Sequence, residues 1–364
     1  MRIRSRRGPH ALVFALVLMI GGVAVAADPN DQTEIYLNSE FMVMNSFGTG
    51  VDAFEIKLEE TDGNSSLGTV GLDSDTDFGW RGDLQLKKGA WGFGVSGFHF
   101  DNDVDEEIFV PNDAASHEVS VRYAAGGVEC MGRGFEAPHG DCLGAASSEW
   151  KTWMVDLYAI RELVSTPDVA VDLQAGLRIA SFDWETSVWA TEVEDPVNGR
   201  IPIADPDENV SFVDSSSDLD DPLVGPFLSL LATGRFGRFQ LEGQLSQAVV
   251  FGAWDGRALF SQYNGLFLDE LTLEEQATLG SSKDLTIPIT DVRLKLGFEI
   301  IDNLVLGVGG YATTWFNVPR PPNSIASDRS ESLSTFQTDE ENITLIGATF
   351  SLSYRFGSGG LLPF

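Results

Sequence analysis

Hydrophobic and polar residues alternate along the last strand-like stretch of the chain. From Ile346 to Phe356 every second residue is apolar or aromatic, and the residues between them are small or polar. A period of two places successive side chains on opposite faces of a β-strand. The same alternation runs through 169–180, 238–251 and 291–300. The chain is therefore predicted to consist of strands that each present one apolar face.

The connections predict how these strands are arranged. Alternation alone fits a soluble sandwich equally well, but here tight turns near 88, 164, 236 and 302 alternate with long segments. Short turns at one end and long loops at the other are typical of an up-and-down barrel in an outer membrane, which strands of about ten residues cross at a tilt. The expected strands are 50–59, 77–87, 90–101, 149–160, 168–181, 224–234, 238–251, 286–299, 303–315 and 342–356.

The predicted fold is an all-β, antiparallel transmembrane β-barrel of about ten strands. Its short turns would face the periplasm and its long acidic loops the cell exterior. Residues 34–44 also alternate and are an alternative first strand, which leaves a count of twelve open.

The first 27 residues have the pattern of a secretory signal peptide. A basic start is followed by an apolar run and by the A-x-A site Ala24-Val25-Ala26. We therefore expect export through a cleaved signal at 1–27, and a single outer-membrane barrel domain over 28–364 with a short tail at 357–364.

The charge of the exported chain limits its partners. Removing residues 1–27 removes four arginines and no acid, which leaves 19 basic and 55 acidic residues and a formal charge of -36. Such a chain repels phosphate, so a nucleic-acid binder is excluded. The long segments hold much of this charge, since residues 182–223 contain twelve acids and one base.

Seven stretches along the chain are informative together: SEFMVM, TGVDAFEI, GWRGDLQLKKGAWGFGVSGFHF, VDLQAGLRIASFD, VGPFLSLLATGRFGRFQLEGQLSQAVVFG, IPITDVRLKLGFEIIDNLVLGVGGYATTWFNVP and NITLIGATFSLSYRF. In this order they resemble strands of the Legionella-type pore-forming major outer membrane protein family. The resemblance implies a porin-like surface barrel, folded by the barrel assembly machinery through its last strand, among outer-membrane lipid and lipopolysaccharide. Such assembly signals usually end the chain. Here Phe356 is assigned as the signal although eight residues follow it.

Two cysteines are the clearest candidate for a covalent site. Cys130 and Cys142 lie in one long segment and are bound for an oxidising compartment, so a disulfide is predicted. The acidic stretch 73–79 lacks the residues of a calcium loop, because Phe78 and Leu84 stand at its sixth and twelfth positions. No specific metal site and no cofactor is expected.

Catalysis is not expected either. Only His99 is placed as a candidate general base, with Asp101 and Asp183 near the same rim, and no nucleophile motif accompanies it. The tryptophans near strand ends are expected to form aromatic girdles at the two membrane interfaces. These are Trp80, Trp91, Trp150, Trp153, Trp184 and Trp315.

The faces opposite the apolar ones carry seven acids and seven bases, which would line the lumen. The acids are Glu55, Asp83, Asp156, Asp172, Glu242, Asp291 and Glu299, and the bases are Lys57, Arg81, Lys87, Arg178, Arg293, Lys295 and Arg355. A near-neutral wall inside about ten strands leaves at most a narrow path. The first hypothesis is a narrow, weakly cation-preferring channel for small solutes or ions. The alternative is a closed structural or adhesive barrel that acts through its acidic loops. The oligomeric state is open.

Overall fold

The computed structural model describes thirteen stretches of the chain: 33–47, 52–60, 65–71, 76–110, 117–123, 129–131, 141–193, 210–219, 221–264, 272–321, 323–325, 335–337 and 340–357. Side chains of 52–71, 108–131 and some further positions are not described. The predicted signal peptide, the tail beyond Gly357 and much of the predicted long loops lie outside these stretches. No helix in the described part is both long and apolar enough to cross a membrane.

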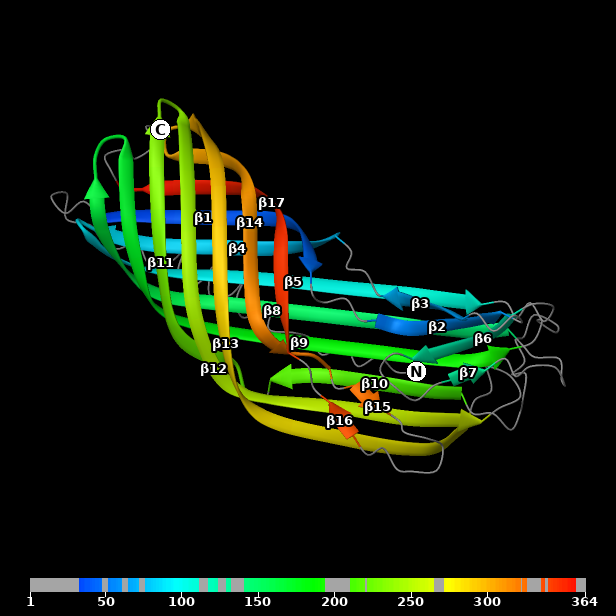
Figure 1. The fold of residues 1–364 in the computed structure, drawn as a ribbon. Coiled ribbons are helices and arrows are strands. Elements are labelled where there is room, and N and C mark those ends of the chain that lie inside the picture. Colours follow the sequence, from blue (N-terminus) through cyan, green and yellow to red (C-terminus); the bar gives the residue numbers. More distant parts are fainter. Residues whose placement is uncertain are drawn as a thin grey trace.

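Ten strands close into an antiparallel ring (Figure 1). Around the ring, each strand pairs with the next and the last pairs with the first, so that β1 and β17 form the closing seam over thirteen residue pairs. The strands are β1 (Thr33–Phe47), β4 (Thr76–Lys88), β5 (Trp91–Val110), β8 (Asp141–Ser165), β9 (Val169–Val193), β11 (Leu223–Phe236), β12 (Phe239–Asn264), β13 (Thr272–Ile301), β14 (Leu304–Pro319) and β17 (Glu340–Phe356). The predicted fold class is confirmed.

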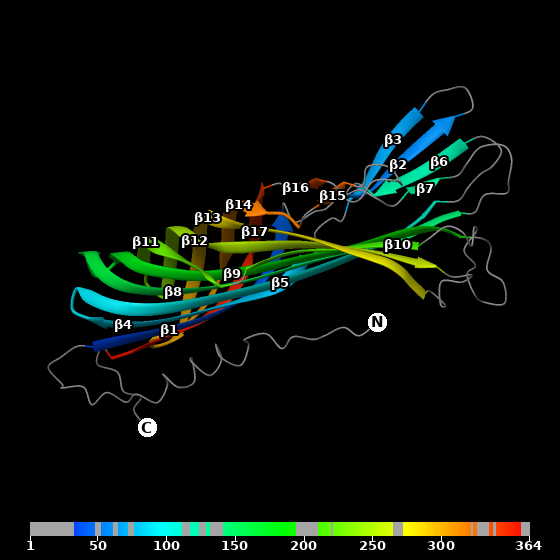
Figure 2. The same cartoon turned by 90° about the horizontal axis from the view of Figure 1, so that it is seen from below.

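The first strand of the ring is residues 33–47, so the expected first strand at 50–59 is wrong. That segment instead forms β2 (Asp52–Glu60) in a separate sheet with β3 (Ser65–Gly71), β6 (His117–Tyr123) and β7 (Glu129–Met131). Glu55 and Lys57 are therefore not part of the ring wall. The small sheet lies beside the far end of the long strands (Figure 2). Ten of the described strands close the ring, so a barrel of twelve strands is excluded.

Tight turns join the strands at one end, which we call the turn end; the opposite end is the loop end. Gly89 and Gly237 have φ values of 60° and 62° in the two-residue turns after β4 and β11. Positive φ is needed in such hairpins, and glycine adopts it without steric cost. The short turns expected near 88, 164, 236 and 302 are confirmed.

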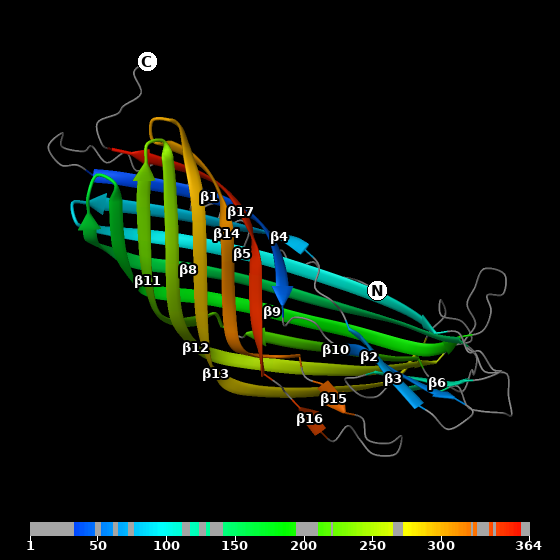
Figure 3. The same ribbon diagram turned by 45° about the horizontal axis from the view of Figure 1, so that its top comes forward.

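One side of the ring extends beyond the other at the loop end (Figure 3). The 25 residues of β9 and the 30 of β13 exceed the 9–11 that cross a bilayer at a tilt. On the loop-end side of β11, the strand β10 (Val210–Leu219) lies between β9 and β12 and pairs with both. A further pair, β15 (Asn323–Ile325) and β16 (Thr335–Gln337), forms a two-stranded sheet.

Apolar side chains cover the outside of the ring in its turn-end half. Leu294 and Phe350, which alternation assigns to the lipid face, are 57% and 54% exposed, and Leu173 is partly exposed. Their chain neighbours Lys295 and Gln174 are buried inside the ring. The alternation is thus inverted relative to a soluble protein, because the apolar face is the outer one.

Candidate functional site

The interior of the ring holds most of the charged residues that the sequence places on its inner wall. Inward positions along β9, β12 and β13 follow the same order from the turn end: charged or polar side chains first, then apolar ones. On β13 the order is Lys295, Arg293, Asp291 and then Ile289 and Ile287. Because neighbouring strands share this order, the interior divides into a polar layer at the turn end and an apolar layer beyond it.

Arg178 is the centre of one half of the polar layer. Its Nε and Nη2 atoms donate to the two carboxylate oxygens of Asp156, at 2.6 and 2.8 Å. Nη2 also lies 2.7 Å from Oδ2 of Asp291, whose Oδ1 accepts from Tyr311. The guanidinium of Arg178 stacks over the ring of Phe227, 4.9 Å from its centroid. Arg178 therefore holds β8, β9 and β13 together across the interior.

Arg293 is the centre of the other half. Its Nη1 lies 2.8 Å from Oε1 of Glu40 and 3.2 Å from Oδ2 of Asp83, and its Nη2 lies 2.8 Å from Oε1 of Glu242. Lys295 lies 3.4 Å from the same Glu242 oxygen and 3.6 Å from Oε1 of Glu40. Arg81 Nη2 lies 3.3 Å from Oδ1 of Asp83, so three carboxylates and three cations share one network.

The predicted inner-wall charges lie inside the ring, but they do not line an open lumen. Arg81, Asp83, Asp156, Asp172, Arg178, Glu242, Asp291, Arg293 and Lys295 are each 1–6% exposed. Arg355 and Glu299 lie nearer the turn end and are partly exposed. Glu40 was missed as a site residue because 34–44 was only the alternative to 50–59 as the predicted first strand. The alternation of Ile35, Leu37, Phe41 and Val43 is the signal that would have found it.

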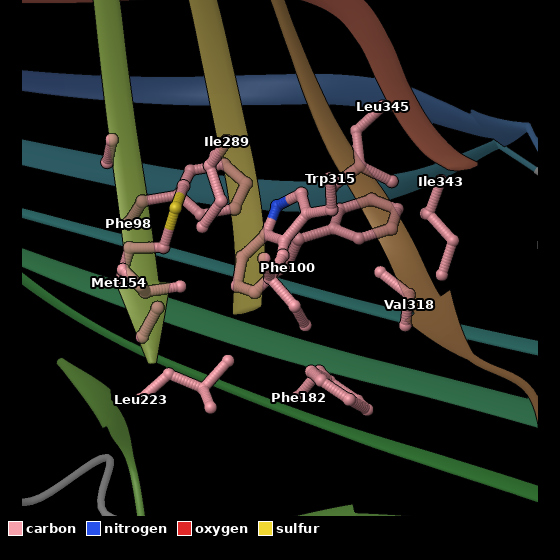
Figure 4. Packing of buried hydrophobic residues seen from close by; sticks show 14 of the residues in the cluster. Phe98, Phe100, Met154, Phe182, Leu223, Ile289, Trp315, Val318, Ile343 and Leu345 are labelled. Atoms are coloured by element: carbon pink, nitrogen blue, oxygen red, sulfur yellow. The ribbon is translucent and has the colours of Figure 1, made fainter. Parts of the chain in front are cut away.

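The apolar layer closes the interior toward the loop end. Phe98, Phe100, Met154, Phe182, Leu223, Ile289, Trp315, Val318, Ile343 and Leu345 meet there from opposite sides of the ring (Figure 4). The indole of Trp150 stacks on Phe182 at a centroid distance of 5.3 Å and meets Trp184 and Trp315 edge-on. Side chains in this layer interdigitate as in the core of a soluble protein.

The expected aromatic girdle is therefore wrong for three of its six tryptophans. Trp150, Trp184 and Trp315 are at most 1% exposed and belong to the apolar layer. Trp91 is exposed at the turn end, where Arg161 stacks on it at 4.5 Å. The remaining two, Trp80 and Trp153, are partly exposed on the outer face. The signal was present in the sequence, because Trp150 and Trp184 lie an even number of residues from inward-facing Asp156 and Arg178 on the same strands.

His99 lies on the outer face, between the paired positions of Trp80 and Trp153. Asp101 follows on the same face, and Lys151 on β8 separates it from Asp183 on β9. The three residues named as a possible catalytic set thus follow the outer wall without meeting in a common cleft.

An acidic patch covers the outer face just beyond these interfacial aromatics. In it, the carboxylates of Asp183, Glu185 and Asp218 have oxygens within 4.8 Å of one another. Burial and the hydrogen bond and charge of Asp218 raise the pKa of Asp183 to about 8. The patch lies beyond the apolar band, on the loop-end part of β9 and β10.

The remaining predicted sites are the assembly signal at Phe356 and the disulfide between Cys130 and Cys142. Phe356 ends β17, is 45% exposed and pairs with Ile35 of the first strand, so it completes the seam. Cys130 lies in β7 and Cys142 at the start of β8, but their side chains are not described. The disulfide between them and the signal role of Phe356 both stay predictions.

A cavity of about 190 Å³ opens at the turn end. Its wall includes Lys87, Asp172 and Glu242 inside the ring and Asp168 in the turn between β8 and β9. Lys87 pairs there with Asp172, Nζ to Oδ2 at 2.5 Å. The cavity extends to the edge of the polar layer that faces the turn end.

Comparison with known proteins finds likeness in structure only. No family matches the sequence, and no curated relative matches it. The outer membrane protease OmpT from Escherichia coli aligns over 92% of this chain and 99% of its own, at 11% identity and a TM-score of 0.43. The toluene transporter TodX of Pseudomonas putida aligns over 91% of both chains at 9% identity and a TM-score of 0.21. A Pseudomonas aeruginosa FadL homologue has 10% identity and a TM-score of 0.19, over 89% of this chain and 90% of its own. No property of these proteins carries over at such values.

The fold and the two faces of its wall define the class of protein. A hydrogen-bonded ring leaves no open sheet edge in the turn-end half, and an apolar outer band surrounds it. A backbone can cross lipid as a sheet only when it closes in this way. The chain is a membrane-spanning antiparallel β-barrel of the outer-membrane type.

Proposed function

We propose that this protein is an outer-membrane surface barrel, closed to solutes at rest, that acts through its acidic loop-end segments. The observation that carries the proposal is the filled interior: a paired polar layer at the turn end and an interdigitated apolar layer above it. The loop end would face the cell exterior, where the acids of 182–223 meet solvent and lipopolysaccharide. No catalytic step is part of this proposal.

Closure has a physical basis in both layers. A hydrated ion that crossed the polar layer would have to separate Arg178 from Asp156 and Asp291, which leaves buried charges uncompensated. It would then enter an apolar layer in which it loses its water without gaining ligands. Either step opposes passage, so the resting barrel should conduct little.

A planar-bilayer recording on refolded protein tests this proposal. We expect no steady conductance from the wild type and frequent openings from Arg178→Ala, which removes the bridge between three strands. The matched control is Lys283→Ala, whose pair with Glu340 is partly exposed. Steady steps from the wild type would overturn closure.

A narrow channel with a weak cation preference is the second candidate. The observation that favours it is the cavity of about 190 Å³, which enters the barrel from the turn end as far as Glu242. Selectivity would come from the acidic loop end, whose field reaches only about 10 Å at 0.1 M salt. Reversal potentials across a salt gradient test it, with a cation preference that fades as salt rises.

The proposed contact role of the acidic loop-end segments can be tested on whole cells. Replacing Asp195, Asp205, Asp207 and Glu208 by their amides removes four charges from the loop that follows β9. If the loops make the contacts, cells carrying this variant should adhere less to a polylysine-coated surface at equal barrel levels. Equal adhesion would contradict a contact role for this loop.

A further inference from the structure

Asp172, on the wall of the turn-end cavity, has a buried carboxylate oxygen without a partner. Asp172 is 6% exposed, and its Oδ2 lies 2.5 Å from Lys87 Nζ. Its other oxygen, Oδ1, is buried and accepts no hydrogen bond from any described residue. An unsatisfied buried carboxylate oxygen is rare and points to a missing donor.

We propose that this cavity binds a small molecule through a primary ammonium group, which pairs with the carboxylate of Asp172. The inference concerns a binding site on the turn side and does not rest on the closure of the barrel. A molecule could bind here whether or not the layers above it ever open.

The charges on the cavity wall favour a cation. Five carboxylates line it, from Glu34, Glu162, Asp168, Asp172 and Glu242. Three cationic side chains line it, from Lys87, Arg235 and Arg355. Glu242 is balanced by Arg293 and Lys295 above the cavity. Four carboxylates then face three cations, so one additional positive charge makes the wall neutral.

The size and spacing of the site favour an organic ammonium over a metal ion. A volume of about 190 Å³ is close to that of six waters, since each water occupies about 30 Å³ in the liquid. A metal ion needs several oxygens around one point. Among the described residues, the only three carboxylates close enough for that are Asp183, Glu185 and Asp218, on the outer face. An ammonium group needs only one strong acceptor at Asp172, with the rest of the molecule filling the cavity.

Titration calorimetry on the folded protein in detergent, at low ionic strength, tests the proposal with butane-1,4-diamine. We expect one saturable site for the diamine and none for butyrate, an anion of similar length. Saturable binding of butyrate instead would assign the cavity to Arg235 and Arg355 and overturn the proposal. Displacement of the diamine by equimolar magnesium would replace it by a metal site.

Two substitutions with opposite expected signs locate the site. Asp172→Asn removes the acceptor charge and should weaken diamine binding at least tenfold. Lys87→Gln removes the ammonium that already occupies Oδ2 and should tighten it. A purely structural role would weaken binding in both, so weakening by Lys87→Gln contradicts the proposal even if Asp172→Asn fails to fold.

The control addresses the acidic exterior of the protein. Asp255→Asn removes a carboxylate from the outer face of β12, far from the turn end, and should leave diamine binding unchanged. If Asp255→Asn weakens binding as much as Asp172→Asn does, the signal comes from the general field of the chain and the site is rejected.

Discussion

Removing Arg178 should destabilise the barrel more than removing any exposed cation. In Arg178→Met the aliphatic part of the side chain remains, while the guanidinium and its three contacts of 2.6–2.8 Å to Asp156 and Asp291 are lost. Both carboxylates are 3% exposed. They would be left buried without their counter-charge.

The expected loss can be bounded from the structure. Breaking a buried ion pair by removing one partner costs about 3–5 kcal/mol. Asp291 keeps the hydroxyl of Tyr311 as a donor and Asp156 keeps that of Ser96, each at 3.2 Å. These bonds offset part of the penalty, so we expect a loss near the lower bound, about 3 kcal/mol. That loss is about a hundredfold in the unfolding equilibrium.

Urea unfolding in detergent micelles or lipid vesicles, followed by tryptophan fluorescence, measures this loss. The control is Lys283→Met, since the Lys283 and Glu340 side chains are 33% and 48% exposed and such surface pairs contribute about 0–1 kcal/mol. Adding Asp156→Asn and Asp291→Asn to Arg178→Met should recover part of the stability, because no buried charge then lacks a partner. Equal losses for Arg178→Met and Lys283→Met would refute a central role for the polar layer.

Three further outcomes are expected. Arginine in place of lipid-facing Leu294 should cost about 2–4 kcal/mol of unfolding free energy at mid-depth, and unchanged stability would reject the lipid face. Phe356→Ala should lower outer-membrane levels more than deletion of 357–364, because Phe356 completes the β1–β17 seam; the reverse order would place the signal at Phe364. Asp183 has a folded pKa of about 8, above its unfolded value, so its contribution to stability is full below the unfolded pKa and is lost as pH rises through 8. Hydrogen exchange at β9–β10, corrected for its intrinsic rate, should therefore rise between about pH 4 and about pH 8, and Asp183→Asn should remove that rise.

One expectation from the sequence changes in light of the packing. A polar face inside a barrel suggests that substitutions at Lys295, Gln174 and Ser351 are tolerated, as they would be along a water-filled lumen. All three are at most 6% exposed. Lys295 also lies within 3.6 Å of Glu40 and Glu242. Replacing Lys295 should therefore destabilise the barrel.

Alternation and loop lengths were enough to predict the barrel, about ten strands, and the inner and outer faces of the nine strands that were placed correctly. The reason is that a period of two is local: once Leu294 faces lipid, Arg293 and Lys295 must face inward. Closure of the ring then follows from the need to satisfy every backbone group in lipid. For the same reason most residues of the buried ion pairs could be predicted to face inward, although their partners were not known.

Which segment opens the ring, and what fills it, depended on tertiary structure. Residues 34–44 and 50–59 both read as strands, and only pairing with β17 and β4 selects 33–47, which brings Glu40 into the network. How Trp150 and Trp315 pack against each other inside the barrel depends on contacts across the ring, between strands far apart in the chain. Local sequence determines the face of a side chain. The packing that turns an inner face into a filled core depends on the long-range pairing of the strands.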